Sequence, residues 1–170
     1  KGFELILHVF EELMKEDLQF VLLGTGEEKY ENDFKALEYH YPDKTSINIK
    51  YYAELAQKIY AASDMFLMPS RYEPCGLSQL ISLRYGSIPV VREIGGLRDT
   101  VKKVSKDGSK GYGFTFPNFN AHEMLHEIQR ALDLYHQPEI WKNIVKRAMK
   151  LDYSWEKSAE AYLNLYQEIK

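Results

Sequence analysis

One ten-residue segment, Ser70 to Gln79 (SRYEPCGLSQ), combines residue types suited to a phosphorylated and hydroxylated ligand. The carboxylate of Glu73 is followed by Pro74 and Gly76, which shape a tight turn before a predicted helix. N–H groups at a helix start lack partners in the helix and favour phosphate oxygens, and a glycine lets a ligand approach the backbone closely. The hydroxyl of Ser78 could cap this helix or donate to a phosphate. Because like charges repel, Glu73 is expected to accept from a sugar hydroxyl and not to bind the phosphate.

Each of these candidate residues has an alternative interpretation without a ligand. Glu73 could be a surface turn residue, and Tyr51 could either stack on a nucleobase or lie in the core. The pair Gly95-Gly96 is also a common turn signal, and Gly24-Thr25-Gly26 lacks the third glycine of a dinucleotide fingerprint. From residue chemistry alone, these alternatives stay open.

Patterns for metal binding are weak. The single cysteine, Cys75, excludes an internal disulfide and a cysteine metal cluster. His122 and His126 lie four residues apart on a predicted helix but not in an HExxH motif, so they are predicted to be a solvated helix face. No carboxylate cluster for magnesium is evident. We therefore expect no metal cofactor.

The segments that must position these residues alternate between strand and helix patterns. Short apolar runs, typical of parallel strands covered on both faces, span 18–23, 46–49, 65–68 and 88–91. Helix patterns lie before and between them, at 3–13, 30–37, 53–62 and 77–85, and three consecutive helices follow at 120–135, 139–150 and 154–169. This order predicts an α/β fold, a Rossmann-like parallel sheet with helices on both faces. Ligands bind beyond the carboxyl ends of such strands, where the candidate residues stand.

Size and charge place further limits on function. A chain of 170 residues is expected to be one domain, 1–170, and its net charge of -3 does not indicate a nucleic-acid or anionic-membrane partner. No apolar run approaches the roughly 20 residues of a membrane span, and a reducing, cytoplasmic setting is the simplest expectation. The polar stretch 102–112 is predicted to be an exposed loop. Because the chain opens on a helix, a first strand is expected upstream of Lys1.

At this point the sequence resembles a known family. The run Ser70 to Val101 (SRYEPCGLSQLISLRYGSIPVVREIGGLRDTV) is similar to the signature of glycogen and starch synthases. Lys1-Gly2 is similar to the family's Q-K-G, and Leu23 to Gly26 (LGTG) to its L-G-x-G. Asp152 to Trp155 (DYSW) is similar to the D-[FY]-S-W that introduces the final helix. The resemblance covers essentially the whole chain.

The resemblance implies a fold and an activity. The fold would be the C-terminal lobe of a two-lobed GT-B glycosyltransferase, and the enzyme would transfer glucose from ADP-glucose to the non-reducing end of an α-1,4-glucan with retention. The expected partners are therefore a nucleotide sugar, an α-glucan and an N-terminal acceptor lobe. We expect this chain alone to be inactive, and its final helix to pack partly against the other lobe with an exposed aromatic stripe in its absence.

The resemblance also implies roles for single residues. Glu73 would contact the donor glucose, and Lys1 would neutralise the leaving diphosphate. Tyr51 would pack near the adenine, and Ser78 stands for a threonine that contacts the diphosphate. The other expected ligand-binding positions are Cys75, Gly76 and Leu77, which would line the glucose and phosphate pocket, together with Gly24, Thr25, Gly95 and Gly96.

Two other functions are compatible with these motifs. A non-catalytic nucleotide- or glucan-binding module would not need Glu73 and Lys1 together. A GT-B transferase with another acceptor is disfavoured by the C-G-L-S-Q stretch and by Ile81, because many relatives in neighbouring families carry a glutamate at that position. The sequence does not decide between adenine and uracil as the donor base.

Overall fold

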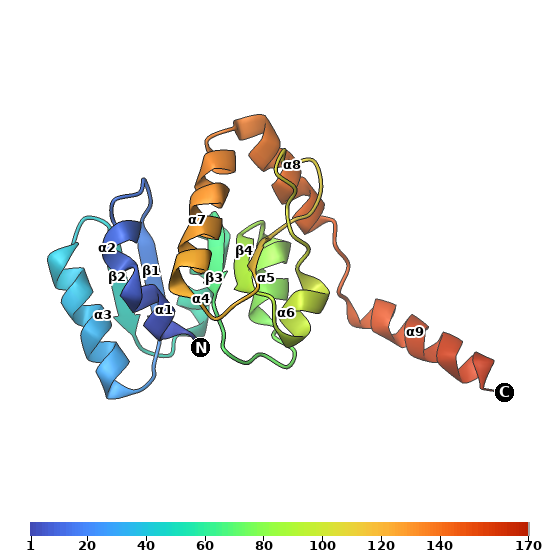
Figure 1. The fold of residues 1–170 in the computed structure, drawn as a ribbon. Coiled ribbons are helices and arrows are strands. Elements are labelled where there is room, and N and C mark those ends of the chain that lie inside the picture. The colour runs from blue at the N-terminus through green and yellow to red at the C-terminus, as the bar shows by residue number, and fades with distance from the viewer. Residues whose placement is uncertain (170) are drawn as a thin grey trace.

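The computed structural model describes residues 1–169, and its strands and helices alternate as predicted (Figure 1). The elements in chain order are α1 (Phe3–His8), α2 (Phe10–Leu13), β1 (Phe20–Gly24), α3 (Glu28–His40), β2 (Thr45–Ile49), α4 (Ala53–Ala62), β3 (Met65–Met68), α5 (Ser78–Tyr85), β4 (Ile88–Arg92), α6 (Gly95–Thr100), β5 (Phe114–Phe116), α7 (Ala121–Tyr135), α8 (Pro138–Met149) and α9 (Trp155–Glu168). The predicted α/β class is confirmed.

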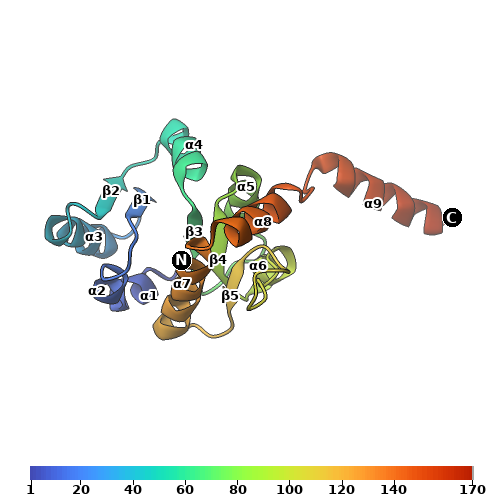
Figure 2. The same cartoon turned by 90° about the horizontal axis from the view of Figure 1, so that it is seen from above.

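The strands are parallel throughout but are divided between two sheets. In one, β1 pairs with β2, and Phe20 lies opposite Thr45. In the other, the order is β3-β4-β5, with Met65 opposite Ile88 and Val90 opposite Phe114. Within residues 1–169, no strand connects β1 to β3, and Figure 2 shows β1 and β2 set apart from β3 to β5. The predicted parallel sheet is therefore present as two separate parts.

The best-buried part of the core lies where α7 and α8 cover β4 and β5. Val90, Phe114 and Phe116 are at most 1% exposed, and Met124 of α7 and Ile144 of α8 are fully buried against them. Full burial of each such side chain contributes about 1.5–3 kcal/mol. The β3–β5 sheet is therefore the more strongly supported scaffold.

Local sequence signals explain several helix ends. The Asn120 side chain accepts hydrogen bonds from the N–H groups of His122 and Glu123 and so caps α7. Pro138 opens α8 at a position where its missing N–H costs nothing. Gly86, with a φ of 82°, ends α5 in the left-handed conformation that glycine adopts readily.

Three features differ from the sequence prediction. The first helix pattern, 3–13, is interrupted at Val9 and forms two helices, α1 and α2. Strand β5 was not predicted, because three residues are too few to show a periodic pattern. The predicted loop at 102–112 is largely exposed, but Val104 and Gly108 are buried in it.

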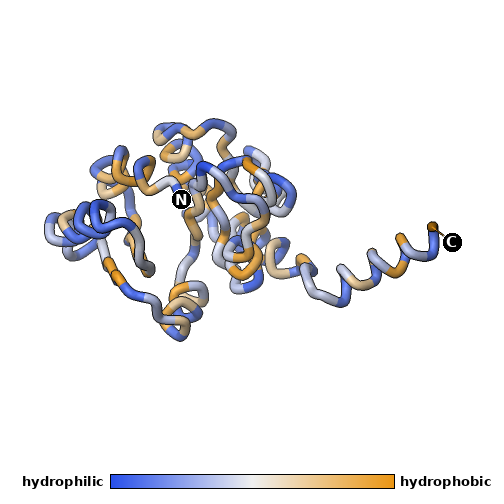
Figure 3. The backbone as a smooth tube through the Cα atoms, turned by 90° about the horizontal axis from the view of Figure 1, so that it is seen from below, coloured by the Kyte–Doolittle hydropathy of each residue, from blue (hydrophilic) through white to orange (hydrophobic). Residues whose placement is uncertain are grey.

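Helix α9 projects from the rest of the molecule (Figure 1). None of its residues is buried, and Figure 3 shows apolar and polar positions alternating along it. Its aromatic side chains include Trp155, 87% exposed, and Tyr166, 61% exposed, so the prediction of an exposed stripe is confirmed. In residues 1–169, no helix has the length and apolar character that crossing a membrane requires.

Candidate active site

The loop between β3 and α5 brings Glu73 and Lys1 together, although they are 72 positions apart. The Glu73 Oε2 atom accepts hydrogen bonds from Lys1 Nζ at 2.7 Å and from Ser70 Oγ at 3.3 Å. The Glu73 side chain is 10% exposed, whereas that of Lys1 is 61% exposed. The alternative that Glu73 is a surface turn residue is therefore wrong, and the carboxylate lies beside an accessible cation.

The position of Lys1 depends on the glycine that follows it. Gly2 has a φ of 83°, and a Cβ atom there would collide with the carbonyl of Pro69, just after β3. Only glycine combines this conformation with such close packing. The chain therefore enters α1 against the carboxyl end of β3, within reach of Glu73.

Gly95 and Gly96 support the same loop from the other side. The Gly96 N–H donates to the Glu73 carbonyl at 3.2 Å. A Cβ atom at Gly95 would collide with the Glu73 carbonyl, and one at Gly96 with the Cys75 carbonyl. These glycines are thus more than a turn signal, because they let the start of α6 pack directly against the loop.

Gln79 holds the turn itself, a role that the sequence analysis missed. Its buried Nε2 donates to the carbonyls of Cys75 at 3.1 Å and Gly76 at 2.8 Å, and to Thr100 Oγ1 at 3.2 Å. Gly76 has a φ of 77°, which accounts for a glycine at the turn. The one available signal was an amide directly after the turn, at the start of a helix.

Arg92, at the end of β4, is a second positioning residue that was missed. Its Nη1 donates to the Arg71 carbonyl at 2.7 Å. The guanidinium groups of Arg71 and Arg92 both lie near the Phe119 ring, at 4.3 and 5.6 Å from its centroid. Phe119 comes after β5, so residue spacing alone could not have indicated this contact.

The start of α5 presents unpaired hydrogen-bond donors beside Glu73. The cap position is Leu77, which makes no side-chain capping bond, so of the two possible roles of the Ser78 hydroxyl, capping or donation to a phosphate, capping is not observed. Within the described residues, the N–H groups of Ser78 and Gln79 form no hydrogen bond with the backbone. Leu77 is 67% exposed and Cys75 is exposed as well. A helix start whose N–H groups lack hydrogen-bond partners attracts anionic oxygens.

Tyr51 belongs to an adjoining cleft on the β1–β2 side. It is 90% exposed, so the alternative of a core residue is wrong. The cleft has a volume of about 520 Å³ and includes Gly24, at the end of β1, together with Ile81 and Tyr85 of α5. Thr25 is exposed on the turn after Gly24 but does not line the cleft. Helix α5 therefore joins the aromatic cleft to the Glu73 loop.

Within residues 1–169, no three His, Cys, Asp or Glu side chains are grouped so that they could hold a metal ion. His122 and His126 are exposed on α7, as predicted. The His122 ring lies edge-on to that of His8, with 5.5 Å between centroids.

The candidate active site thus consists of a carboxylate, an accessible ammonium group, unpaired N–H donors and an exposed aromatic ring. This set can hold a phosphorylated ligand by its phosphates and a hydroxylated group by Glu73.

Comparison with known proteins agrees with this geometry. Residues 1–148 match the family described as Glycosyl transferases group 1. The glycogen synthase of Clostridium novyi (strain NT) is 56% identical over 99% of this chain and 35% of that protein. The glycogen synthase of Bacillus cereus (strain Q1) is 52% identical over 99% of this chain and 36% of that protein. The chain spans about a third of the length of these relatives.

A solved structure is similar over the same extent. The catalytic domain of starch synthase IV from Arabidopsis thaliana, bound to ADP and acarbose, has a TM-score of 0.87 and 36% identity. The match covers 99% of this chain and 36% of that one. The resemblance to glycogen and starch synthases that the sequence indicated is confirmed.

Proposed function

Because this chain belongs to the group 1 glycosyl transferases, we propose that it is the donor-binding domain of a retaining glucosyltransferase. The whole enzyme would transfer glucose from ADP-glucose to the non-reducing end of an α-1,4-glucan. The observation that carries the proposal is the contact of 2.7 Å between Lys1 Nζ and Glu73 Oε2, beside the start of α5. A carboxylate for the sugar and a cation for the diphosphate are thereby adjacent.

The demanding step in such a transfer is departure of the nucleotide diphosphate, which gains negative charge as the glycosidic bond breaks. Lys1 and the N–H groups of Ser78 and Gln79 are the groups that would stabilise this charge. Because they are already in place, little reorganisation is needed during the reaction. We expect them to suffice without a metal cofactor.

Glu73 suits binding of the sugar better than attack on it. Its Oε2 is engaged by Lys1 and Ser70, its own backbone carbonyl accepts from the Gly96 N–H, and the Gly76 carbonyl that follows in the loop accepts from Gln79. A carboxylate fixed in this way accepts strongly from sugar hydroxyls and orients the ring. We therefore assign it to the donor glucose.

The aromatic cleft is the proposed nucleobase site. Tyr51 offers an exposed ring at its mouth, and Gly24 leaves room at the end of β1, since no atom lies within 4 Å of a Cβ placed there. The starch synthase IV relative was solved with ADP, which supports adenine over uracil. Cys75, Gly76 and Leu77 would line the glucose and phosphate pocket.

The remaining two thirds of the relatives' length is the proposed source of the acceptor side. We propose that this part, an N-terminal lobe, contributes the glucan groove and that the apolar stripe of α9 packs partly against it. The present chain alone would then bind nucleotide without making polymer. A cytoplasmic setting is expected, since the one cysteine, Cys75, is free and exposed.

Calorimetric titration of this chain with ADP, with UDP for comparison, tests the site. We expect ADP to bind more tightly, and Tyr51→Ala and Ser78→Ala each to weaken it about tenfold by removing a stacking or hydrogen-bonding partner. Tyr39→Ala is the matched control, because Tyr39 is 85% exposed on α3, away from the cleft. Equal losses in all three variants, or no binding of either nucleotide, would contradict the proposed placement.

Activity separates an enzyme from a non-catalytic binding module. In the complete protein, Glu73→Gln should lower kcat for glucosyl transfer by at least about 100-fold while ADP still binds, because the sugar contact is lost and the diphosphate contacts remain. Unchanged transfer would remove Glu73 from the reaction. Absence of transfer in the unaltered complete protein would favour the binding module.

A further inference from the structure

Thr100, the last residue of α6, is hydrogen-bonded to both groups that hold the Glu73 loop. Its Oγ1 donates to the Gly96 carbonyl at 2.6 Å and accepts from Gln79 Nε2 at 3.2 Å. The Gly96 N–H donates to the Glu73 carbonyl at 3.2 Å. Gln79 donates to the Gly76 carbonyl at 2.8 Å. The bond to Gly96 is a common local contact of a helical threonine, but the bond to Gln79 is not local and joins α6 to the turn.

The Gln79 amide depends on Thr100 for its orientation. The side chain is fully buried, and within the described residues its Oε1 atom has no hydrogen-bond partner. Its orientation is therefore set by Nε2, whose two N–H groups face three oxygen acceptors, the Thr100 hydroxyl and the carbonyls of Cys75 and Gly76. Both carbonyls belong to the turn that the amide must hold, so Thr100 supplies a contact from outside it. A buried amide that is only partly satisfied is sensitive to the loss of a partner.

Tyr153 extends these contacts to the connection 150–154 between α8 and α9. Its hydroxyl donates to the Thr100 carbonyl at 2.9 Å, across 53 positions of the sequence. The last carbonyls of a helix have no partner within it, and the hydroxyl satisfies one of them at the end of α6. A continuous path of hydrogen bonds thus leads from the connection, through Thr100 and Gln79, to the turn.

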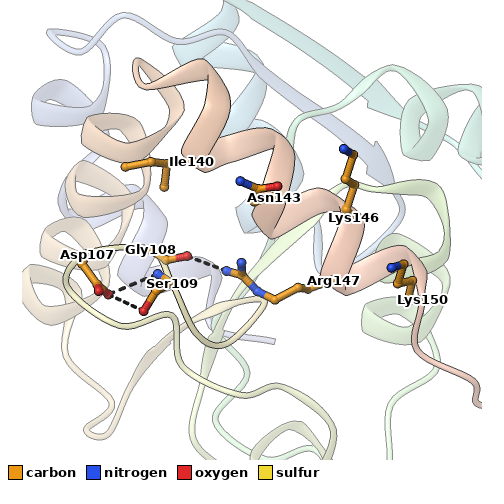
Figure 4. A pocket seen from close by; sticks show the side chains of 8 residues that line it. All are labelled: Asp107, Gly108, Ser109, Ile140, Asn143, Lys146, Arg147 and Lys150. Atoms are coloured by element: carbon orange, nitrogen blue, oxygen red, sulfur yellow. Dashed lines mark hydrogen bonds between the residues drawn. The ribbon is translucent and has the colours of Figure 1, made fainter.

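The loop 105–110, which packs beside α8, is fixed by its own hydrogen bonds. Asp107 accepts from Ser105 Oγ and from the N–H and Oγ of Ser109. These bonds, the one from Ser105 first, lower the pKa of Asp107 to about 2, so that it is ionised at any physiological pH. A cleft of about 450 Å³ lies between this loop and α8, with Asp107 on its wall (Figure 4). The loop is therefore a firm support beside α8.

Arg147 fastens the end of α8 to this loop. It donates from Nη2 to the Gly108 carbonyl at 2.6 Å, a bond drawn in Figure 4, and from Nε to the Gly111 carbonyl at 2.8 Å. Helix α8 ends two residues later, at Met149, and Tyr153 follows four residues beyond that end. The connection therefore starts from a fixed point, which places the Tyr153 hydroxyl against the end of α6.

We propose that Thr100 and Tyr153 are positioning residues of the donor site. Neither is expected to contact the ligand, and both act through Gln79 on the turn and helix start that receive the diphosphate. The proposal rests on the proposed function, because it takes this turn to be the diphosphate site. The connection 150–154 thereby sets how firmly the turn is held, although it lies more than 70 positions away in the sequence.

Calorimetric titration with ADP and the NMR signal of the Gln79 side-chain amide, both on this chain, test the proposal. Thr100→Val removes the hydroxyl with little change of shape, and we expect it to weaken ADP binding about five- to tenfold and to shift the Gln79 signal. Tyr153→Phe should weaken binding about two- to threefold and shift the same signal, because it acts one step further away. Thr100→Ser keeps the hydroxyl and should bind ADP as the unaltered chain does.

A double variant separates a positioning role from a purely structural one. Thr100→Val/Tyr153→Phe should bind ADP no more weakly than Thr100→Val alone, because both changes break the same path. Losses that arise independently would instead add. Tyr162→Phe is the matched control for the loss of a tyrosine hydroxyl, because Tyr162 is 62% exposed on α9. It should alter neither ADP binding nor the Gln79 signal.

The proposal is overturned if Ser78→Ala weakens ADP binding while Thr100→Val and Tyr153→Phe do not. It is also overturned if the Gln79 signal is unchanged in both variants, or if their losses in ADP binding add in the double variant. Failure of ADP to bind to the unaltered chain would contradict the proposed function itself, and the inference with it.

Discussion

The two sheets of this molecule start from similar sequences and reach different degrees of burial. The runs FVLLG in β1 and IPVVR in β4 are both apolar, yet Val21 of β1 is 48% exposed, whereas residues 88–91 of β4 are all buried. Among the described residues, strand β4 has a partner on each side and helices over its faces, while β1 pairs with β2 alone. An apolar run therefore predicts a strand, but its neighbours decide how much of it is buried.

The same contrast divides the candidate site. On the β3–β5 sheet, Glu73 is buried, paired with Lys1 and held through its backbone. On the β1–β2 sheet, Tyr51 is 90% exposed. The part of the site assigned to the sugar and the diphosphate is thus formed before a ligand binds, whereas the part assigned to the base is exposed to solvent.

Truncation of a core side chain in each sheet should show the largest difference. We expect Phe114→Ala in β5 to lower the free energy of unfolding by about 3–5 kcal/mol, because it leaves a cavity in the best-packed region. Val21→Ala in β1 should cost less than about 1 kcal/mol, since half of that side chain is already in water. Urea denaturation measures both, and equal losses would remove the distinction between the sheets.

Added methyl groups at two glycines provide a sharper test near the site. In Gly96→Ala the new methyl collides with the Cys75 backbone, and we expect a loss of about 1–3 kcal/mol together with weakened ADP binding. Gly24→Ala, where nothing lies within 4 Å, should change stability by no more than about 0.5 kcal/mol. Thermal unfolding of the two variants, each followed by calorimetry, gives the comparison. A Gly24→Ala variant as unstable as Gly96→Ala would contradict it.

A smaller effect is expected from breaking the ion pair of the site. Lys1→Gln leaves the largely buried Glu73 without its cation, at a cost of about 1 kcal/mol, moderated because Lys1 itself is 61% exposed. The exposed Lys58–Glu54 pair on α4 is the control, and Lys58→Gln should cost about 0.3–0.5 kcal/mol. If the two variants are indistinguishable in urea titrations, the Glu73 carboxylate is better solvated than its burial indicates.

The smallest effect concerns the loop 105–110, which is held by hydrogen bonds to Asp107. Because the pKa of Asp107 is lowered to about 2 from 3.8, its bonds stabilise loop 105–110 above pH 3.8. That contribution should disappear as the pH falls through about 2. The Asp107 carboxyl shift in NMR should titrate near the lower value, and Ser109→Ala should raise the midpoint toward 3.8. A midpoint already near 3.8 in the unaltered chain would show that the loop is not held.

Much of the fold could be predicted because its signals are local. The apolar runs at 65–68 and 88–91 became β3 and β4, and the helix pattern at 77–85 became α5. The segment 70–79 indicated a carboxylate, a turn and a helix start in that order, and the structure contains them in that order. Strand β5 was not predicted because three residues are too few to show a periodic pattern. The break at Val9 was not predicted because no helix-breaking residue marks it.

The positioning contacts of the site could not be read in the same way. Gln79 and Arg92 act through backbone carbonyls of the loop, and any residue can supply a carbonyl. Gly95 and Gly96 were identified as candidates, but their packing against Glu73 and Cys75 depends on where α6 lies. The cleft at Asp107 is formed by two segments more than 30 residues apart, and neither is distinctive alone.

The sequence by itself therefore determined the order of strands and helices, the chemistry of the 70–79 segment and the family to which it belongs, because each is carried by neighbouring residues. The tertiary structure alone decided that Lys1 contacts Glu73, that the Tyr51 ring is exposed to solvent and that the parallel strands form two sheets. These outcomes depend on how distant segments pack, and packing energy is shared among contacts that no stretch of sequence contains.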